Sequence, residues 1–158
     1  MPPIELDING GVFMRYVYPA IFYKDKKMSE TYSVIFPDVP GAATCGYSLY
    51  EAIYMAEDAL AGMLVMWEDF KAGKSDLPMS NRIVEPTPIS EIVAEPDEYS
   101  SEAFVTLIKA DTDVYRKILE ELPPRDEDDE NDDLEVPDTL AKELCRLAGI
   151  KYPFEDKK

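Results

Sequence analysis

Residues 36–52, FPDVPGAATCGYSLYEA, decide the fold that the sequence predicts. The segment PDVPG, residues 37–41, stops one strand and turns the chain. Residues 42–47, AATCGY, are long enough only for a short further strand. Ser48 followed three residues later by Glu51 is a capping box, because each side chain can satisfy a backbone N–H that the first helical turn leaves unpaired. The segment therefore predicts a strand end, a turn, a short strand and the start of a helix.

Three more strand-like segments surround this unit. Residues 16–23, YVYPAIFY, are rich in aromatic and β-branched side chains. Pro19 has no backbone N–H to donate to a neighbouring strand, so we expect that side of the strand to face outward or toward an edge. The polar residues 24–30 form a hairpin loop into residues 31–36, TYSVIF. Residues 102–110, EAFVTLIKA, alternate between two faces and supply the last strand.

Helical periodicity begins at the capping box. Apolar residues at three- and four-residue spacing predict a helix of about five turns whose apolar face packs on the sheet: Leu49, Ala52, Ile53, Ala56, Leu60, Met63, Leu64 and Trp67. Gly73 closes this helix. Residues 75–101 are proline-rich and predict an extended surface connection. Asp111 caps a second helix that runs through Leu122, with Val114, Ile118 and Leu122 on one stripe.

A run of charge divides the chain. Residues 125–133, RDEDDENDD, cannot bury themselves and predict a flexible linker. We expect an N-terminal extension (1–14), an α+β domain (15–122), an acidic linker (123–134) and a C-terminal arm (135–158) that is separate from the main domain. The predicted fold class is α+β, a β-β-β-α-β sheet with helices packed on one face, plus a small C-terminal helical arm.

Composition limits the chemistry. Thirty-three acidic and sixteen basic residues give a formal net charge of −17, which repels a phosphate backbone and favours a basic partner or solubility alone. No apolar run reaches the roughly 20 residues of a membrane helix, and the N-terminus lacks signal-peptide order, so we expect a cytoplasmic protein and no membrane. Cys45 and Cys145 stand a hundred positions apart and predict idle thiols rather than a disulfide or a metal site.

Catalytic residues are not expected. The chain has no histidine, so a serine or cysteine nucleophile lacks its commonest activating base. Asp38 and Asp111, each near a strand end, are the only candidates for metal-assisted phosphoryl chemistry, and both also suit turn or capping duty. We therefore predict no catalytic residue, no cofactor and no metal.

One flank of the predicted long helix combines aromatic and acidic side chains. An exposed patch of this kind suits a basic protein partner. The alternative is that the proline-rich connection covers the flank. The partner-binding candidates on this flank are Tyr50, Tyr54, Glu57, Asp58, Ala61 and Val65.

An ordered set of motifs resembles the HicB antitoxin family. The motifs are YPAIFY, YSVIFPDVPG, CGYSLYEAIYMAEDAL and LPMS, and together they cover about residues 16–80. Residues 104–117, FVTLIKADTDVYRK, are similar to the last strand and following helix of longer members. The resemblance implies a degenerate, partial RNase H-like fold and the antitoxin role in a type II toxin–antitoxin pair.

The resemblance also implies a partner. In this family the partner is HicA, a small basic ribonuclease with its own catalytic histidine. The chain would then be a non-enzymatic antitoxin that binds and neutralises a small basic mRNA-cleaving toxin, and we expect it to form a homo-oligomer. Two alternatives stay open: a metal-dependent nuclease on the same scaffold, and a stand-alone nucleic-acid-binding transcriptional regulator.

The C-terminal arm departs from the longer family members. LEVPDTLAKELCRLAGIKYPF, residues 134–154, resembles the strand and first helix of a ribbon-helix-helix module. Asp132 and Asp133 precede the strand that would read DNA, and the sequence stops before a second helix. The acidic charge at this position weighs against operator DNA binding by the truncated arm.

Overall fold

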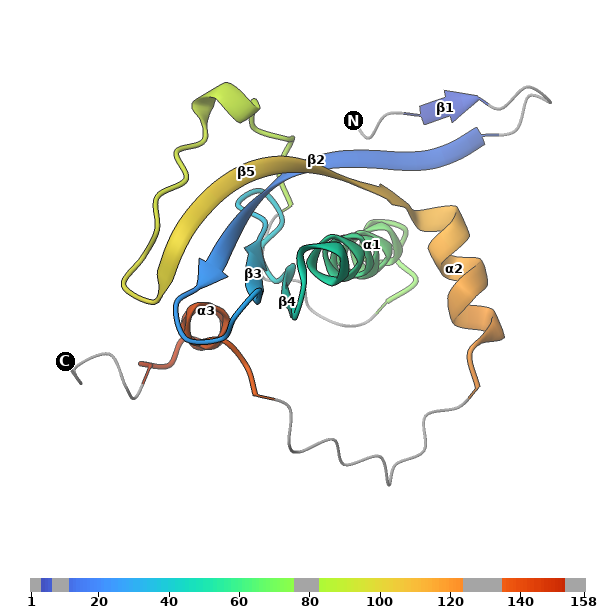
Figure 1. The fold of residues 1–158 in the computed structure, drawn as a ribbon. Coiled ribbons are helices and arrows are strands. Elements are labelled where there is room, and N and C mark those ends of the chain that lie inside the picture. Colours follow the sequence, from blue (N-terminus) through green and yellow to red (C-terminus); the bar gives the residue numbers. More distant parts are fainter. Residues whose placement is uncertain (1–3, 7–11, 76–82, 124–134, 153–158) are drawn as a thin grey trace.

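The computed structural model describes residues 4–6, 12–75, 83–123 and 135–152 (Figure 1). The predicted acidic linker and most of the N-terminal extension lie outside these ranges. The elements in chain order are β1 (Ile4–Leu6), β2 (Val12–Asp25), β3 (Tyr32–Ile35), β4 (Ala43–Gly46), α1 (Leu49–Lys71), the 3₁₀ helix η1 (Ile89–Glu91), β5 (Ser100–Asp111), α2 (Thr112–Glu121) and α3 (Asp138–Ala148). None of the helices in the described ranges is long and apolar enough to cross a lipid bilayer.

The sheet confirms the predicted α+β class. Its four main strands run antiparallel in the order β5-β2-β3-β4, and the short β1 pairs with the first residues of β2. Strand β1 falls in the segment that was expected to be only an extension. Pro19 pairs opposite Leu107 of β5, in a part of β2 that lies before the residues paired with β3. Pro19 therefore lacks its backbone N–H in a part of β2 that has no hydrogen bonds to β3.

Helix α1 packs on one face of this sheet. The side chains of Tyr16, Tyr18, Ala20 and Phe22 alternate onto that face of β2 and are buried against the apolar face of the helix. The buried residues of α1 are Ala52, Ala56, Leu60, Ala61, Leu64 and Val65. Their spacing is the predicted helical one, so the period of the sequence accounts for the core.

The start of α1 lies directly on the backbone of β4. A Cβ atom added to Gly46 would lie 2.2 Å from the backbone nitrogen of Ala52 and 2.5 Å from its Cα. Ser48 caps the helix as predicted, since its Oγ accepts a hydrogen bond from the N–H of Glu51 at 3.1 Å. The carboxylate of Glu51 accepts the N–H of Tyr47, at 3.2 Å, and not that of the cap residue. Two features therefore define where the helix begins: the Ser48 cap and the absence of a side chain at Gly46.

A polar cluster fixes α2 against α1 and β2. The hydroxyls of Tyr16 and Thr112 both donate to Oε2 of Glu68, each at 2.8 Å. Arg116 on α2 donates to Oε1 of Glu68 at 3.2 Å and pairs with Asp69 at 2.9 Å. Burial raises the pKa of Tyr16, and its hydrogen bond to Glu68 raises it further. The Tyr16 hydroxyl is therefore a stable donor over the whole physiological pH range.

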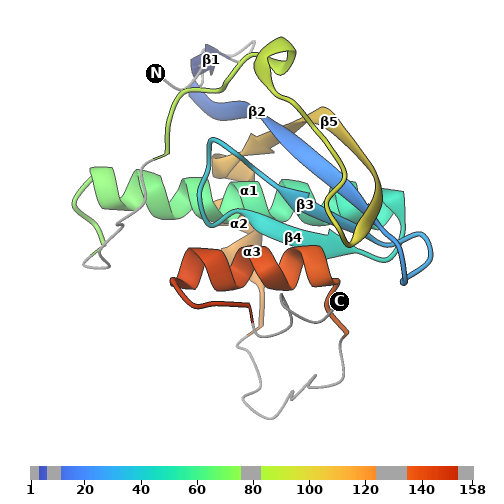
Figure 2. The same cartoon turned by 90° about the vertical axis from the view of Figure 1, so that its left-hand side faces the viewer.

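The C-terminal arm lies against the domain, which differs from the expectation of a separate module. Helix α3 packs on β2, β3 and β4, on the face opposite α1 (Figures 1 and 2). Thr139 donates to Asp97 at 3.0 Å, and Lys142 pairs with Glu98 at 3.1 Å. Tyr47 donates to the carbonyl of Glu135 at 2.9 Å. These contacts join segments far apart in sequence, so the local sequence pattern does not predict them.

The proline-rich connection is irregular, as predicted, and Asp38 and Tyr18 bind its first described residues. Its only regular element in the described range 83–99 is η1. The carboxylate of Asp38 accepts the N–H of Thr87 at 2.8 Å and its hydroxyl at 2.7 Å. Tyr18 donates to the carbonyl of Val84 at 3.0 Å. Asp38 is therefore buried as a tether for this connection.

The close approach of β4 and α1 leads to a stability prediction. Gly46→Ala should lower the free energy of unfolding by about 3 kcal/mol, because the new methyl group meets backbone atoms and the strand or the helix must shift to admit it. Gly62→Ala is the matched control: the nearest atoms to its Cβ all belong to the Tyr115 side chain, and the closest is the hydroxyl oxygen at 3.3 Å. Since alanine is favoured over glycine inside a helix by about 1 kcal/mol, this control should stay within about 1 kcal/mol of the parent.

Urea unfolding followed by circular dichroism measures both variants. A Gly46→Ala protein as stable as the parent would contradict the close approach of β4 and α1.

Candidate protein-binding site

The first two turns of α1 carry large apolar side chains that point away from the sheet. Tyr50 is 85% exposed and Tyr54 is 65% exposed. Leu49 and Ile53, which were expected to pack on the sheet, are also exposed. The reason is the contact of the Gly46 backbone with Ala52, which turns Ala52 and Ala56 inward and leaves the opposite side to solvent. We call Leu49, Tyr50, Ile53 and Tyr54 the aromatic face.

Two carboxylates continue the aromatic face along the helix. Glu57 is half-buried and Asp58 is exposed, and both follow Tyr54 within about one turn. Within the described part of the chain, no ion pair of Glu57 is found. Its charge is therefore available to a cation from outside.

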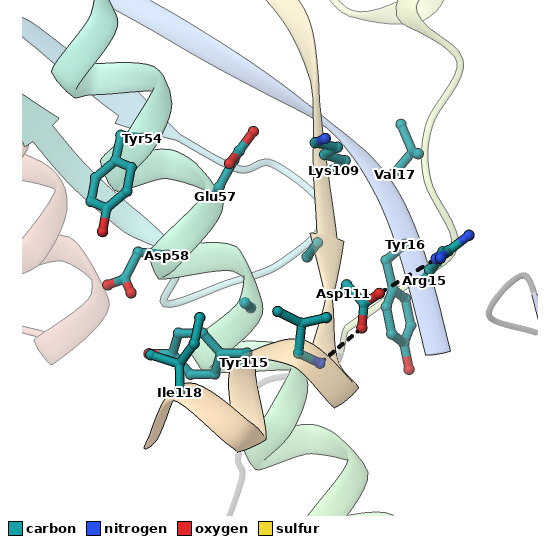
Figure 3. Close-up of a pocket in the computed structure, with 13 residues that line it drawn as sticks. Arg15, Tyr16, Val17, Tyr54, Glu57, Asp58, Lys109, Asp111, Tyr115 and Ile118 are labelled. Atoms are coloured by element: carbon teal, nitrogen blue, oxygen red, sulfur yellow. Dashed lines mark hydrogen bonds and ion pairs between the residues drawn. The ribbon is translucent and has the colours of Figure 1, made fainter. Parts of the chain in front are cut away.

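A groove of about 560 Å³ begins at Tyr54 and runs between α1, α2 and the ends of β2 and β5 (Figure 3). In Figure 3, Tyr54 and Asp58 on α1 and Ile118 on α2 lie on one side of β5, and Arg15 and Val17 of β2 lie on the other. The residues that line the groove are Arg15, Tyr16, Val17, Tyr54, Glu57, Asp58, Ala61, Lys109, Ala110, Asp111, Val114, Tyr115 and Ile118.

Helix α2 supplies an apolar wall of the groove. Val114 and Ile118 lie on the stripe that the sequence predicted, and the structure leaves both about half exposed. Tyr115 reaches back over Gly62 of α1. Burial raises the pKa of Tyr115, and the charge of Asp58 and a hydrogen bond to it raise it further. Tyr115 and Asp58 thus join the two helices at the floor of the groove.

The strand ends supply the polar part of the groove. Asp111 caps α2 as predicted, because one carboxylate oxygen accepts the N–H of Val114 at 3.0 Å. Its other oxygen pairs with Arg15 of β2 at 3.4 Å. Lys109 lies on β5 beside this pair. The groove therefore has apolar walls, carboxylates on α1 and cations at the sheet.

The six partner-binding candidates divide into two groups. Tyr50, Tyr54, Glu57 and Asp58 reach solvent, and three of them line the groove or its rim.

Ala61 and Val65 do not belong to an exposed surface. Ala61 is only 5% exposed, at the floor of the groove, and Val65 is 8% exposed. Helix α2 covers this half of the flank, as the hydrogen bond from Arg116 to the carbonyl of Val65 at 3.4 Å shows. The expected cover was the proline-rich connection, whereas the contact found in the described residues comes from α2.

The two candidate metal ligands have structural partners. Asp38 holds Thr87, and Asp111 caps α2 and pairs with Arg15. In the described ranges, no three histidine, cysteine, aspartate or glutamate side chains gather as a metal site would require.

Sequence reasoning missed several residues of the groove. Arg15, Lys109 and Tyr115 carried no local signal, because only the pairing of β2 with β5 and the packing of α2 bring them beside α1. The stripe of Val114 and Ile118 was a usable signal, since a short amphipathic helix leaves its apolar side open when no later segment covers it.

Sequence and structure comparisons relate the chain to known proteins. The family described as "HicB_like antitoxin of bacterial toxin-antitoxin system" matches residues 18–122. The comparison with curated proteins gives no match. A toxin–antitoxin complex from Streptococcus pneumoniae contains a chain with 24% identity and a TM-score of 0.46, over 87% of this chain and 91% of that one.

The N-terminal domain of Burkholderia pseudomallei antitoxin HicB is also similar. It has 24% identity and a TM-score of 0.40, over 58% of this chain and 94% of that domain. The assignment rests on the family match, which spans the sheet from the middle of β2 through α2 and so includes most of the groove. The chain belongs to the HicB-like antitoxins of bacterial toxin–antitoxin systems.

Proposed function

We propose that this chain is the antitoxin of a HicA/HicB-type pair in the cytoplasm, where it binds and neutralises a small basic mRNA-cleaving toxin. The chain acts by binding and is not itself an enzyme. The observation that carries the proposal is the aromatic face with its adjoining carboxylates. The six sequence-derived candidates reduce to four contact residues: Tyr50, Tyr54, Glu57 and Asp58.

Exposed tyrosines support a protein partner. Monomeric proteins rarely leave several large apolar side chains together in solvent, and such patches mark interaction sites. Tyr50 and Tyr54 lie one helical turn apart on the same side of α1, so one partner surface can contact both rings. Tyrosine is also among the residues that most often dominate binding energy.

Charge supports a basic partner. The chain carries a net charge of −17, and Glu57 and Asp58 adjoin the aromatic rings. An interface with aromatic anchors at its centre and acids at its rim attracts a cationic protein and orients it during encounter. A ribonuclease that binds RNA phosphates needs a basic surface, which the acidic antitoxin can cover.

Neither alternative function has comparable support. A metal-dependent nuclease needs clustered carboxylates, and Asp38 and Asp111 instead serve as a tether and a helix cap. A nucleic-acid-binding regulator needs a basic surface. Lys142 and Arg146, the basic residues within α3, are paired with Glu98 and Glu143. The arm that resembles half of a ribbon-helix-helix is docked on the sheet.

Mutation of a tyrosine anchor and mutation of a rim carboxylate should change different rate constants of binding. Tyr54→Ala should raise the dissociation rate about thirtyfold, the effect of losing an anchor worth about 2 kcal/mol. Glu57→Gln should mainly lower the association rate and its dependence on salt. Surface plasmon resonance against the product of the adjacent open reading frame, which we expect to be a small basic protein, measures both rates.

Matched controls lie far from α1 in sequence and outside the groove. Leu144→Ala removes an exposed apolar side chain from α3, and Glu95→Gln removes an exposed charge from the proline-rich connection. Both should bind like the parent, and circular dichroism checks that all four variants are folded. If Tyr54→Ala and Glu57→Gln also bind like the parent, the aromatic face is not the interface.

The purified chain should not cleave RNA. With magnesium or manganese present, neither single-stranded RNA nor an RNA–DNA hybrid should be degraded above the buffer background, because Asp38 and Asp111 have structural roles. Gel electrophoresis of end-labelled substrates measures this. Cleavage that disappears in a folded Asp38→Asn variant would favour the nuclease and overturn the antitoxin proposal.

A further inference from the structure

Strand β5 is an edge strand of the main sheet. It is 12 residues long and pairs with β2 from Arg15 to Asp25. Within the described ranges no strand pairs with its other edge. A strand in this position presents a row of backbone N–H and C=O groups that can hydrogen-bond to another chain.

This edge carries few of the features that normally prevent pairing. Proteins protect edge strands with prolines, charges, bulges or a covering segment. From Ala103 to Ala110 the strand has no proline and a single charge, Lys109. Its register shift lies near its N-terminal end, opposite Lys24 and Asp25. Leu107 is 56% exposed on the face opposite α1. The stretch from Ala103 to Ala110 thus has one charge and one exposed leucine, and no strand in the described ranges pairs with its outer edge.

The groove lies at the C-terminal end of this strand, where Lys109, Ala110 and Asp111 line it. Tyr16 and Ala110 belong to the face buried on α1, whereas Val17 and Lys109 lie on the opposite face, and all four line the groove. Strand β5 is the outermost strand on this side of the sheet. A groove that touches both faces of the sheet must therefore pass around the edge or the end of β5. A chain segment paired with β5 would therefore reach the groove at the last residues of the strand, Lys109 to Asp111.

We propose that the partner adds an extended segment to the open edge of β5, with alternate side chains directed into the groove between α1 and α2. This inference rests on the proposed function and specifies how the toxin would bind. Backbone hydrogen bonds to β5 would supply affinity, and the groove would select side chains, as in other cases of strand addition. Apolar side chains would meet Val114 and Ile118, and a lysine or arginine would meet Glu57.

The charges favour a basic partner over a second copy of this chain. Two copies paired at this edge would bring their groove carboxylates together, and the repulsion between these charges opposes pairing here. The acids that line the groove, Glu57, Asp58 and Asp111, outnumber the cations Arg15 and Lys109. The expected segment is therefore an extended stretch of alternating apolar and basic residues.

Hydrogen–deuterium exchange read residue by residue by NMR tests the inference on the full chain, alone and with the product of the adjacent open reading frame. In an antiparallel ladder successive N–H groups point to opposite sides of the strand, so β2 protects only about half of the β5 amides in the free chain. The other half, between Ala103 and Lys109, should become at least about tenfold slower to exchange in the complex.

The outcomes separate this inference from the proposed function. Binding that protects α1 but leaves the β5 amides unchanged would overturn the strand addition and leave the antitoxin role standing. Absence of any binding would overturn both. Protection of the same amides in the free chain, together with a dimeric mass by light scattering, would show that a second copy occupies the edge.

A pair of matched variants gives an independent readout. Leu107→Lys places a positive charge beside the expected basic segment and should weaken binding about tenfold or more, because lysine on an edge strand opposes pairing. Val93→Lys adds the same charge at an exposed apolar position of the proline-rich connection and should change affinity by less than about twofold. Equal effects of the two variants would overturn the inference.

Discussion

The contact between the Gly46 backbone and the first turn of α1 is the constraint on which the rest of the structure depends. It leaves no room for a side chain at Gly46, and the Ser48 cap begins the helix at that point. Together they set the rotation of α1, so that Ala52 and Ala56 face the sheet and the aromatic face points to solvent. The same short segment that ends β4 thus determines which side chains a partner can reach.

The second half of α1 depends on a polar contact instead. Glu68 accepts hydrogen bonds from Tyr16, Thr112 and Arg116, which join β2, α1 and α2. A partly buried carboxylate with three donors is costly to disrupt, because each donor would lose its partner. The cluster therefore holds α2 in place as the wall of the groove. Burial by α2 also explains why Ala61, on the same flank of α1, is not exposed.

Periodicity and capping predicted most of the fold but only part of the site. The strands, the start of α1 at Ser48 and the cap of α2 at Asp111 depend on neighbouring residues, and the structure confirms them. The burial of Val65 and the docking of α3 depend on contacts such as Arg116 with Val65 and Thr139 with Asp97. Such contacts join distant segments and leave no local pattern. Tyr50 and Tyr54 were identifiable because the helix period places them opposite Ala52 and Ala56.

The central claim is that the chain neutralises an RNA-cleaving toxin by covering it with the surface formed by α1, α2 and the edge of β5. The most direct measurement is the rate at which the product of the adjacent open reading frame cleaves RNA while this chain is added stepwise. The account predicts that cleavage falls to background once the chain is in molar excess. Cleavage that continues at its full rate while the two proteins are bound to each other would contradict it.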